Sequence, residues 1–189
     1  MPLIMTFTSP MTLEDLIDRY YSDGLTNIDH ILHFEETPQV WTVDEDSQMG
    51  DTIFFTCAEN AVAHMARLVA EIASFEGQVE DFDQVLAYAK NQQNLYETYA
   101  GQLLAVGRLA SPPFQRESPG YAFAAWSNPW YAKVSDFRRL TQPLPVSAFS
   151  DFIIFSETSS RTYLTDDQYH QLSLFVLGYL DFQLKLRED

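Results

Sequence analysis

Tryptophans and a hydroxyl-rich segment are the residues of this 189-residue chain whose types and spacing favour a specific chemistry. Trp41 lies in a short apolar stretch, whereas Trp126 and Trp130 flank the sequence Ser-Asn-Pro, and residues 156–162 contain five hydroxyl side chains and one arginine. Aromatic faces stack on flat ligands while hydroxyls and backbone groups bind the ligand's edge, so these residues predict a concave binding site. The alternative is that the tryptophans are core or interface residues, and composition alone favours that interpretation.

Catalytic chemistry has less support in the sequence. Cys57 ends an apolar stretch in an acidic neighbourhood that offers no cation to stabilise a thiolate, so we expect a packed core cysteine, although His64 follows seven residues later. His30 and His33 stand three residues apart beside acidic side chains, but two histidines without a third placed ligand are a weak zinc signal. Motifs for serine hydrolases, zinc proteases, P-loops and dinucleotide binding do not occur.

We therefore expect a non-catalytic protein that needs no metal and no cofactor. A hydrolase or metal enzyme built on His30, His33 and nearby carboxylates stays open as an alternative.

The charge is strongly negative and unevenly distributed. The chain has 27 acidic and 11 basic side chains, a formal net charge of −16. Residues 1–100 contain 18 acidic and 3 basic side chains, whereas residues 101–189 contain 9 and 8. Such a surface repels phosphate at long range, which counts against a generic nucleic-acid coat or an anionic-membrane binder. Any surface that faces an anion is therefore expected in the second half.

A weak basic set in that second half has two possible roles. If its members converge on one face they can follow a nucleic-acid strand, and if they are scattered they balance local acids, as we expect for Arg138 and Arg139. The set comprises Arg108, Arg116, Lys133, Arg138, Arg139 and Arg161.

The compartment is predicted from cysteine content and from the start of the chain. A single cysteine permits no intramolecular disulfide, which indicates a reducing environment. We recognise neither a signal peptide nor an uninterrupted apolar stretch of about 18 residues. These features predict a soluble cytoplasmic protein without membrane contact.

Periodicity and turn signals predict an α+β fold built from alternating short elements. We expect a small curled or closed, mostly antiparallel β-barrel with flanking helices, in one domain over residues 1–189. An N-terminal extension covers about 1–39, and a helical hairpin at about 58–100 forms an insertion or a lid. The expected helices are 12–21, 58–74, 81–98 and one that Thr165 caps, with a helical turn at 146–149; the expected strands are 40–43, 52–57, 103–109, 130–134 and 153–155.

Three passages over about residues 40–180 resemble the PUA-like superfamily. The first is the tryptophan of residues 41–43 followed by the Gly-Asp and apolar strand of residues 50–55. The second is the glycine-punctuated strand within residues 99–109. The third combines residues 131–134, 143–147, 155–160 and 164–165 before the last helix. Together they are most similar to the EVE-type domain, a relative of the YTH and ASCH domains.

The resemblance implies a small curled barrel that binds modified bases of DNA or RNA by flipping them into an aromatic pocket, without catalysis. It places Trp41 and Thr42 on one pocket wall and Trp126 and Trp130 on the approaching loop. The hydroxyl-bearing side of the predicted site comprises Ser156, Ser159, Ser160 and the adjoining Arg161. Two features depart from the family: Glu157-Thr158 stands where relatives often carry a basic or amide pair, and the net charge is −16.

Two kinds of binding function remain on this fold. In the first, the pocket binds a modified base or nucleotide. In the second, the protein is an acidic interaction module without a nucleic-acid ligand, and its acidic half, including the helical hairpin, faces a basic partner protein.

Overall fold

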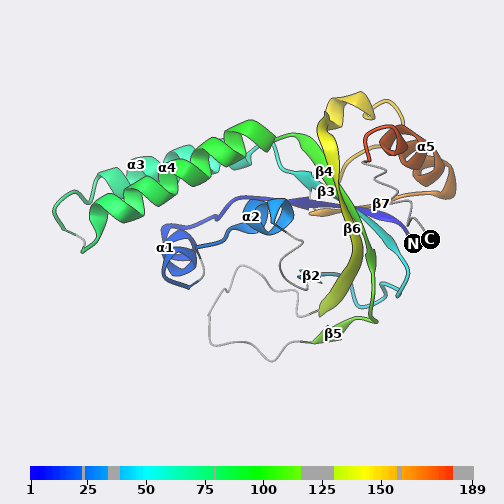
Figure 1. Ribbon diagram of the computed structural model, residues 1–189, viewed down its shortest axis with the longest axis horizontal. Coiled ribbons are helices and arrows are strands. Elements are labelled where there is room, and N and C mark those ends of the chain that lie inside the picture. Colours follow the sequence, from blue (N-terminus) through cyan, green and yellow to red (C-terminus); the bar gives the residue numbers. More distant parts are fainter. Residues whose placement is uncertain (23, 34–38, 79, 116–129, 157–158, 181–189) are drawn as a thin grey trace, which may run out of the picture.

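A curled sheet forms the centre of the molecule, with helices on both sides (Figure 1). The computed structural model describes residues 1–22, 24–33, 39–78, 80–115, 130–156 and 159–180. Within these residues the seven-stranded sheet has the order β2-β6-β4-β3-β1-β7, and β5 pairs with β6. The strands are β1 (Leu3–Phe7), β2 (Gln39–Thr42), β3 (Thr52–Cys57), β4 (Gln102–Leu109), β5 (Phe114–Gln115), β6 (Trp130–Pro145) and β7 (Arg161–Tyr163).

The strand pairing is mixed. β1 and β3 run parallel, whereas the other paired strands run antiparallel. Among the described strands, β2 and β7 stand at the two ends of the order, so this sheet is curled but open. The α+β class, the curled sheet and the flanking helices are therefore confirmed.

Helices cover the two faces of the sheet in different ways. They are α1 (Leu13–Ser22), α2 (Asn27–Leu32), α3 (Ala61–Ala73), α4 (Phe82–Tyr99) and α5 (Asp166–Leu177). The pair α3 and α4 is the expected helical hairpin between β3 and β4, and it extends far from the sheet on the side of α1 and α2 (Figure 1). Helix α5 lies on the opposite side. No helix in the described part of the chain has the length and apolar character needed to cross a membrane.

Alternating side chains divide the interior into two cores. In β1, Leu3, Met5 and Phe7 join a core that contains residues of α1 to α4, whereas Ile4 joins a second core with α5. In β3, Phe55 joins the first of these cores and Phe54 joins the second. A strand directs successive side chains to opposite faces, so every strand residue can be assigned a side. We call these sides the α2 face and the α5 face.

Several elements differ from the sequence-based expectation. The predicted strand at 153–155 is wrong: the segment has no strand pairing, because Ile153 is buried beside Phe149 while Ile154 is 88 % exposed. β6 continues well past residue 134 to Pro145. β1, α2 and β7 were not expected, and β1 lies between β3 and β7 in the sheet. The two-residue strand β5 was not expected either, and residues 116–129 lie outside the described residues.

Candidate functional site

Trp41 and Trp130 lie on neighbouring strands at one end of the sheet. Trp41 in β2 stands opposite Ala132 of β6, two residues from Trp130, and the Val43 amide donates to the Trp130 carbonyl at 3.0 Å. Both tryptophans are half-buried and pack against the core of the α2 face. The Trp41 ring meets the Phe55 ring edge-on, with centroids 5.1 Å apart. The core therefore fixes the Trp41 indole while part of its surface stays accessible.

Arg161 joins the same face from the other end of the sheet. It stands opposite Met5 in β1, and its Nη1 forms an ion pair with Oδ1 of Asp44 at 2.8 Å. Its Nη2 donates to the Val43 carbonyl at 3.4 Å, and the Tyr163 hydroxyl donates to the Asp44 carboxylate. Asp44 follows β2 closely, so these contacts connect the two end strands beside Trp41.

The electrostatics of this contact favour neutral Tyr163. Burial raises the pKa of Tyr163 above its ordinary value, and the hydrogen bond to Asp44 and that carboxylate's charge raise it further. In Arg161, Nε is buried and has no hydrogen-bond partner among the described residues. Among these residues the Nε–H is therefore unused, while Nη1 and Nη2 bind Asp44 and Val43 and each keep a second N–H.

The expected serines lie in the approach to β7. Ser156, Ser159 and Ser160 are exposed. The Ser159 amide donates to Oγ of Ser156 at 3.0 Å, and the Arg161 amide donates to Oγ of Ser159 at 3.1 Å. These two hydroxyl oxygens accept from backbone amides at and just before the start of β7, a role that sequence reasoning did not anticipate.

The two remaining predicted site residues are Thr42 and Trp126. Thr42 stands opposite Tyr131 and directs its side chain to the α5 face, away from Trp41. Trp126 lies outside the described residues. The structure therefore brings Trp41, Trp130 and Arg161 together on one face.

The basic set divides between the two faces. Arg108, Lys133 and Arg138 are exposed on the α5 face of β4 and β6. Arg139 points the other way and donates to the Leu32 carbonyl of α2 at 2.5 Å. Arg116 lies outside the described residues, and Arg161 binds Asp44.

The residues considered for metal or nucleophilic chemistry are not assembled. His30 lies in α2 and His33 is its exposed C-cap. Among the described residues, no group of three or more His, Cys, Asp or Glu side chains is placed to hold a metal ion. Burial raises the pKa of the Cys57 thiol to about 12, so this cysteine is a poor nucleophile near neutral pH. The expected core cysteine is confirmed.

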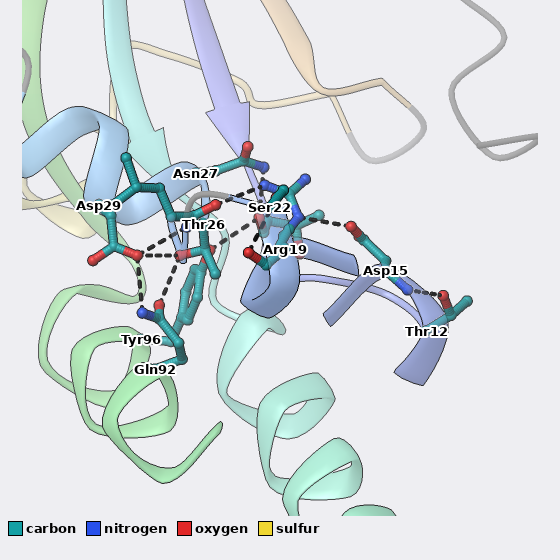
Figure 2. A network of polar contacts seen from close by, with 11 residues as sticks. Thr12, Asp15, Arg19, Ser22, Thr26, Asn27, Asp29, Gln92 and Tyr96 are labelled. Carbon is teal, nitrogen blue, oxygen red and sulfur yellow. Dashed lines mark hydrogen bonds and ion pairs between the residues drawn. The ribbon is translucent and has the colours of Figure 1, made fainter. Parts of the chain in front are cut away.

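A buried polar network at the root of the helical hairpin was not singled out from the sequence (Figure 2). Oδ2 of Asp29 accepts hydrogen bonds from the Thr26 amide at 2.8 Å and from Nε2 of Gln92 at 2.9 Å. Oγ1 of Thr26 donates to Oε1 of Gln92 at 2.7 Å. Tyr96 in α4 and Asn27 in α2 both donate to the Thr8 carbonyl, at 3.5 and 3.0 Å.

This network joins α2 to α4, and it joins both helices to the segment that follows β1. Thr26, Asp29 and Gln92 are all buried. The available signal was Thr26-x-x-Asp29, a pattern in which an N-cap residue and the third helical residue bond each other's backbone. Gln92 is on α4, so no local pattern indicates its part. The network fits a structural role that fixes the hairpin's root.

Comparison with known proteins does not assign the chain to a family. No protein-family model matches it, and no curated protein is similar to it.

Proposed function

We propose that this chain is a non-catalytic, PUA-like binding module that holds a flat base, preferably a modified base of DNA or RNA, on the α2 face. The observation that carries the proposal is the placement of half-buried Trp41 beside Trp130 and Arg161 at the meeting of the two end strands. Under this proposal the curled sheet is a small barrel that the Asp44–Arg161–Tyr163 contacts close between β2 and β7.

The proposed chemistry combines stacking with one directional donor. The Trp41 indole, already fixed edge-on by Phe55 and Phe7, needs little ordering to stack on a base. The second N–H of Nη1 or Nη2, which Asp44 and Val43 leave unused, would donate to an acceptor on the ligand's edge, since part of the Arg161 side chain is accessible. Asp44 keeps the guanidinium in place by occupying its other side.

Tryptophan fluorescence titration tests this proposal. Modified and unmodified nucleosides and short oligonucleotides are added at low and moderate salt, and saturable quenching by one modified base is the expected result. Trp41→Ala should weaken that binding by about 1–3 kcal/mol, whereas Trp41→Phe, which keeps a stacking face and a core contact, should lose less. Thermal unfolding of both variants serves as the control for loss of folding.

Two results would contradict the proposal. One is the absence of saturable quenching with every nucleoside and oligonucleotide. The other is unchanged affinity in Trp41→Ala and in Arg161→Lys, since the lysine keeps the charge but loses the planar donor set.

The charge at the outer end of the hairpin favours a second candidate, an acidic module that binds a basic protein. Between residues 71 and 83 the described acidic side chains are exposed, and the sequence has no lysine or arginine there. These acids are Glu71, Glu76, Glu80, Asp81 and Asp83. A pull-down at low salt, with Glu76→Gln/Glu80→Gln/Asp83→Asn as the variant, should recover a basic protein that the variant loses. Equal recovery by both proteins would count against this candidate.

A further inference from the structure

Three cations gather on the α5 face of β4 and β6. Arg108 of β4 stands opposite Ser135, and Val106 stands opposite Arg138. Lys133 precedes Ser135 by two residues, so both direct their side chains to the same side. Phe137, next to Arg138, packs into the α2-face core, which confirms the opposite direction of Arg138. All three cations are exposed. We call these residues the cation face.

A β-bulge brings these residues together. Between the pairs Arg108–Ser135 and Val106–Arg138, β4 advances by two residues while β6 advances by three. Asp136 occupies the bulge with φ of 49°, a left-handed conformation that Asp and Asn tolerate better than most residues. In a regular strand Lys133 and Arg138, five residues apart, would face opposite sides. The bulge reverses this alternation and adds Arg138 to the face of Lys133.

Within the described ranges, the cations of this face have no carboxylate partner. Arg108, Lys133 and Arg138 form no ion pair with any residue that the structure describes. The ion pairs among those residues involve the N-terminus, Arg19 and Arg161 instead. Asp136 is exposed in the bulge itself, so its carboxylate opposes an incoming anion. Because exposed charges more than about 8 Å apart are largely screened at physiological salt, most of the −16 net charge acts weakly here.

Two aromatic side chains continue the cation face. Tyr131 precedes Lys133 by two residues on the same side of β6, and Phe114 of β5 stands directly opposite Tyr131. Both are half-buried. Cations that follow a phosphate backbone beside aromatic rings that stack on bases are the combination that binds single-stranded nucleic acid. An acidic peptide would use the cations but would gain nothing specific from the aromatic pair.

We propose that the cation face binds the sugar–phosphate backbone of a single-stranded nucleic acid. The choice of nucleic acid over another polyanion rests in part on the proposed base-binding function. For single strands, each phosphate contact contributes about −0.7 to the slope of log affinity against log salt concentration. Three contacts therefore predict an affinity loss of about 20-fold between 50 and 200 mM salt.

Fluorescence anisotropy with a labelled, unmodified thymidine oligonucleotide tests this inference. In Arg108→Gln/Lys133→Gln/Arg138→Gln, affinity at low salt should fall and the 20-fold salt dependence should nearly vanish. The control Arg67→Gln/Lys90→Gln/Arg139→Gln has the same net charge, but its substitutions lie away from the cation face, so it should bind almost as the wild type does. Asp136→Asn removes the opposing carboxylate with little change of shape and should bind more tightly.

The outcomes separate this inference from the proposed function. Equal losses in both triple variants, or an unchanged salt slope in the cation-face variant, would overturn it. Poly-glutamate that competes as well as the oligonucleotide would overturn the choice of nucleic acid. Oligonucleotide binding that depends on the cation face, without any nucleoside quenching, would support this inference while the base site fails. Nucleoside quenching together with salt-independent oligonucleotide binding would support the base site and overturn this inference.

Discussion

Replacement of Gln92 tests whether the buried network fixes the root of the helical hairpin. Gln92 on α4 is 2 % exposed, and its amide donates to Asp29 at 2.9 Å and accepts from Thr26 at 2.7 Å. Gln93, the next residue, is a matched control on the same helix, because its amide bonds Glu97 at 2.7 Å on the exposed surface. The substitutions Gln92→Ala and Gln93→Ala therefore remove the same atoms from two different environments.

The expected magnitudes differ clearly. A hydrogen bond to a charged group contributes about 1.5–3 kcal/mol and a neutral one about 0.5–1.5 kcal/mol. Part of the free energy of the lost Thr26–Gln92 bond is recovered in Gln92→Ala, because the Thr26 hydroxyl can still donate to Oδ2 of Asp29 at 3.1 Å. We expect Gln92→Ala to lower the free energy of unfolding by about 2–4 kcal/mol. The exposed Gln93–Glu97 hydrogen bond joins side chains four residues apart on a helix, and such a pair contributes about 0.5 kcal/mol or less. We therefore expect Gln93→Ala to lower the free energy of unfolding by no more than about that amount.

Urea unfolding at neutral pH measures both losses, provided that each variant keeps the wild-type slope of unfolding free energy against urea concentration. A third variant, Gln92→Glu, places a second carboxylate beside Asp29, so its loss should exceed that of Gln92→Ala and shrink as the solution is acidified. If Gln92→Ala lost no more stability than Gln93→Ala, the network would not stabilise the hairpin's root. The interpretation of the hairpin as a movable lid would then regain support.

Three further predictions concern a helix cap, a close packing contact and a buried thiol. Thr165→Ala removes the hydroxyl that accepts from the Gln168 amide at 3.3 Å, and thermal unfolding should show a loss of about 1 kcal/mol. Gly107→Ala places a Cβ 2.7 Å from Cγ1 of Val134 and should cost about 1–3 kcal/mol by overpacking. The control Gly178→Ala, whose Cβ would have the Phe175 carbonyl at 4.0 Å as its nearest neighbour among the described residues, should be nearly neutral in the same denaturation assay. The folded state raises the pKa of Cys57 from 9.0 to about 12 and so favours the neutral thiol. Its contribution to stability is therefore complete below pH 9 and decreases as the pH rises toward 12. Alkylation at neutral pH should accordingly label Cys57 in the unfolded protein far faster than in the native one, and equal rates would contradict its burial.

Elements whose stability comes from local pattern were predictable from the sequence. Val62, Met65, Val69 and Ile72 of α3 repeat at the spacing of one helix face, and Met65 and Ile72 are buried while the two valines are half-buried. The Thr165–Gln168 capping box marks the start of α5 from residues three apart. β3 is apolar and β-branched over nearly its whole length, because both of its faces are covered.

Elements that depend on distant partners were not predictable in this way. α2 is six residues long, and Gln92 from α4 supplies bonds to its first turn, so its local sequence looked like a turn. β1 pairs in parallel with β3, a partner about 50 residues later, which no local signal reveals. The segment 153–155 is apolar because Ile153 and Phe155 pack into the α5-face core, not because a ladder forms.

The candidate site shows the same division. The tryptophans could be selected by residue type, but their shared face depends on the pairing of β2 with β6. Adjacent residues Trp41 and Thr42 were placed on one pocket wall, whereas strand alternation directs them to opposite faces. The gathering of Arg138 with Lys133 required the bulge at Asp136, which is visible only in the register.

The two proposed contact regions lie on opposite faces of the same strands, and this restricts how one nucleic-acid strand can reach both. β2 stands at the end of the described sheet order, so its edge, ahead of the Asp44–Arg161 contact, is the short path from the cation face to Trp41. A strand held by Lys133 and Tyr131 would pass Thr42 at that edge before a base turned onto the α2 face. A free nucleoside has no backbone to follow this path. Its affinity should therefore be unaffected by loss of the cation face, whereas an oligonucleotide that contains the preferred base should lose affinity when either region is changed. If nucleoside and oligonucleotide respond identically to both sets of substitutions, the two regions do not act on one strand.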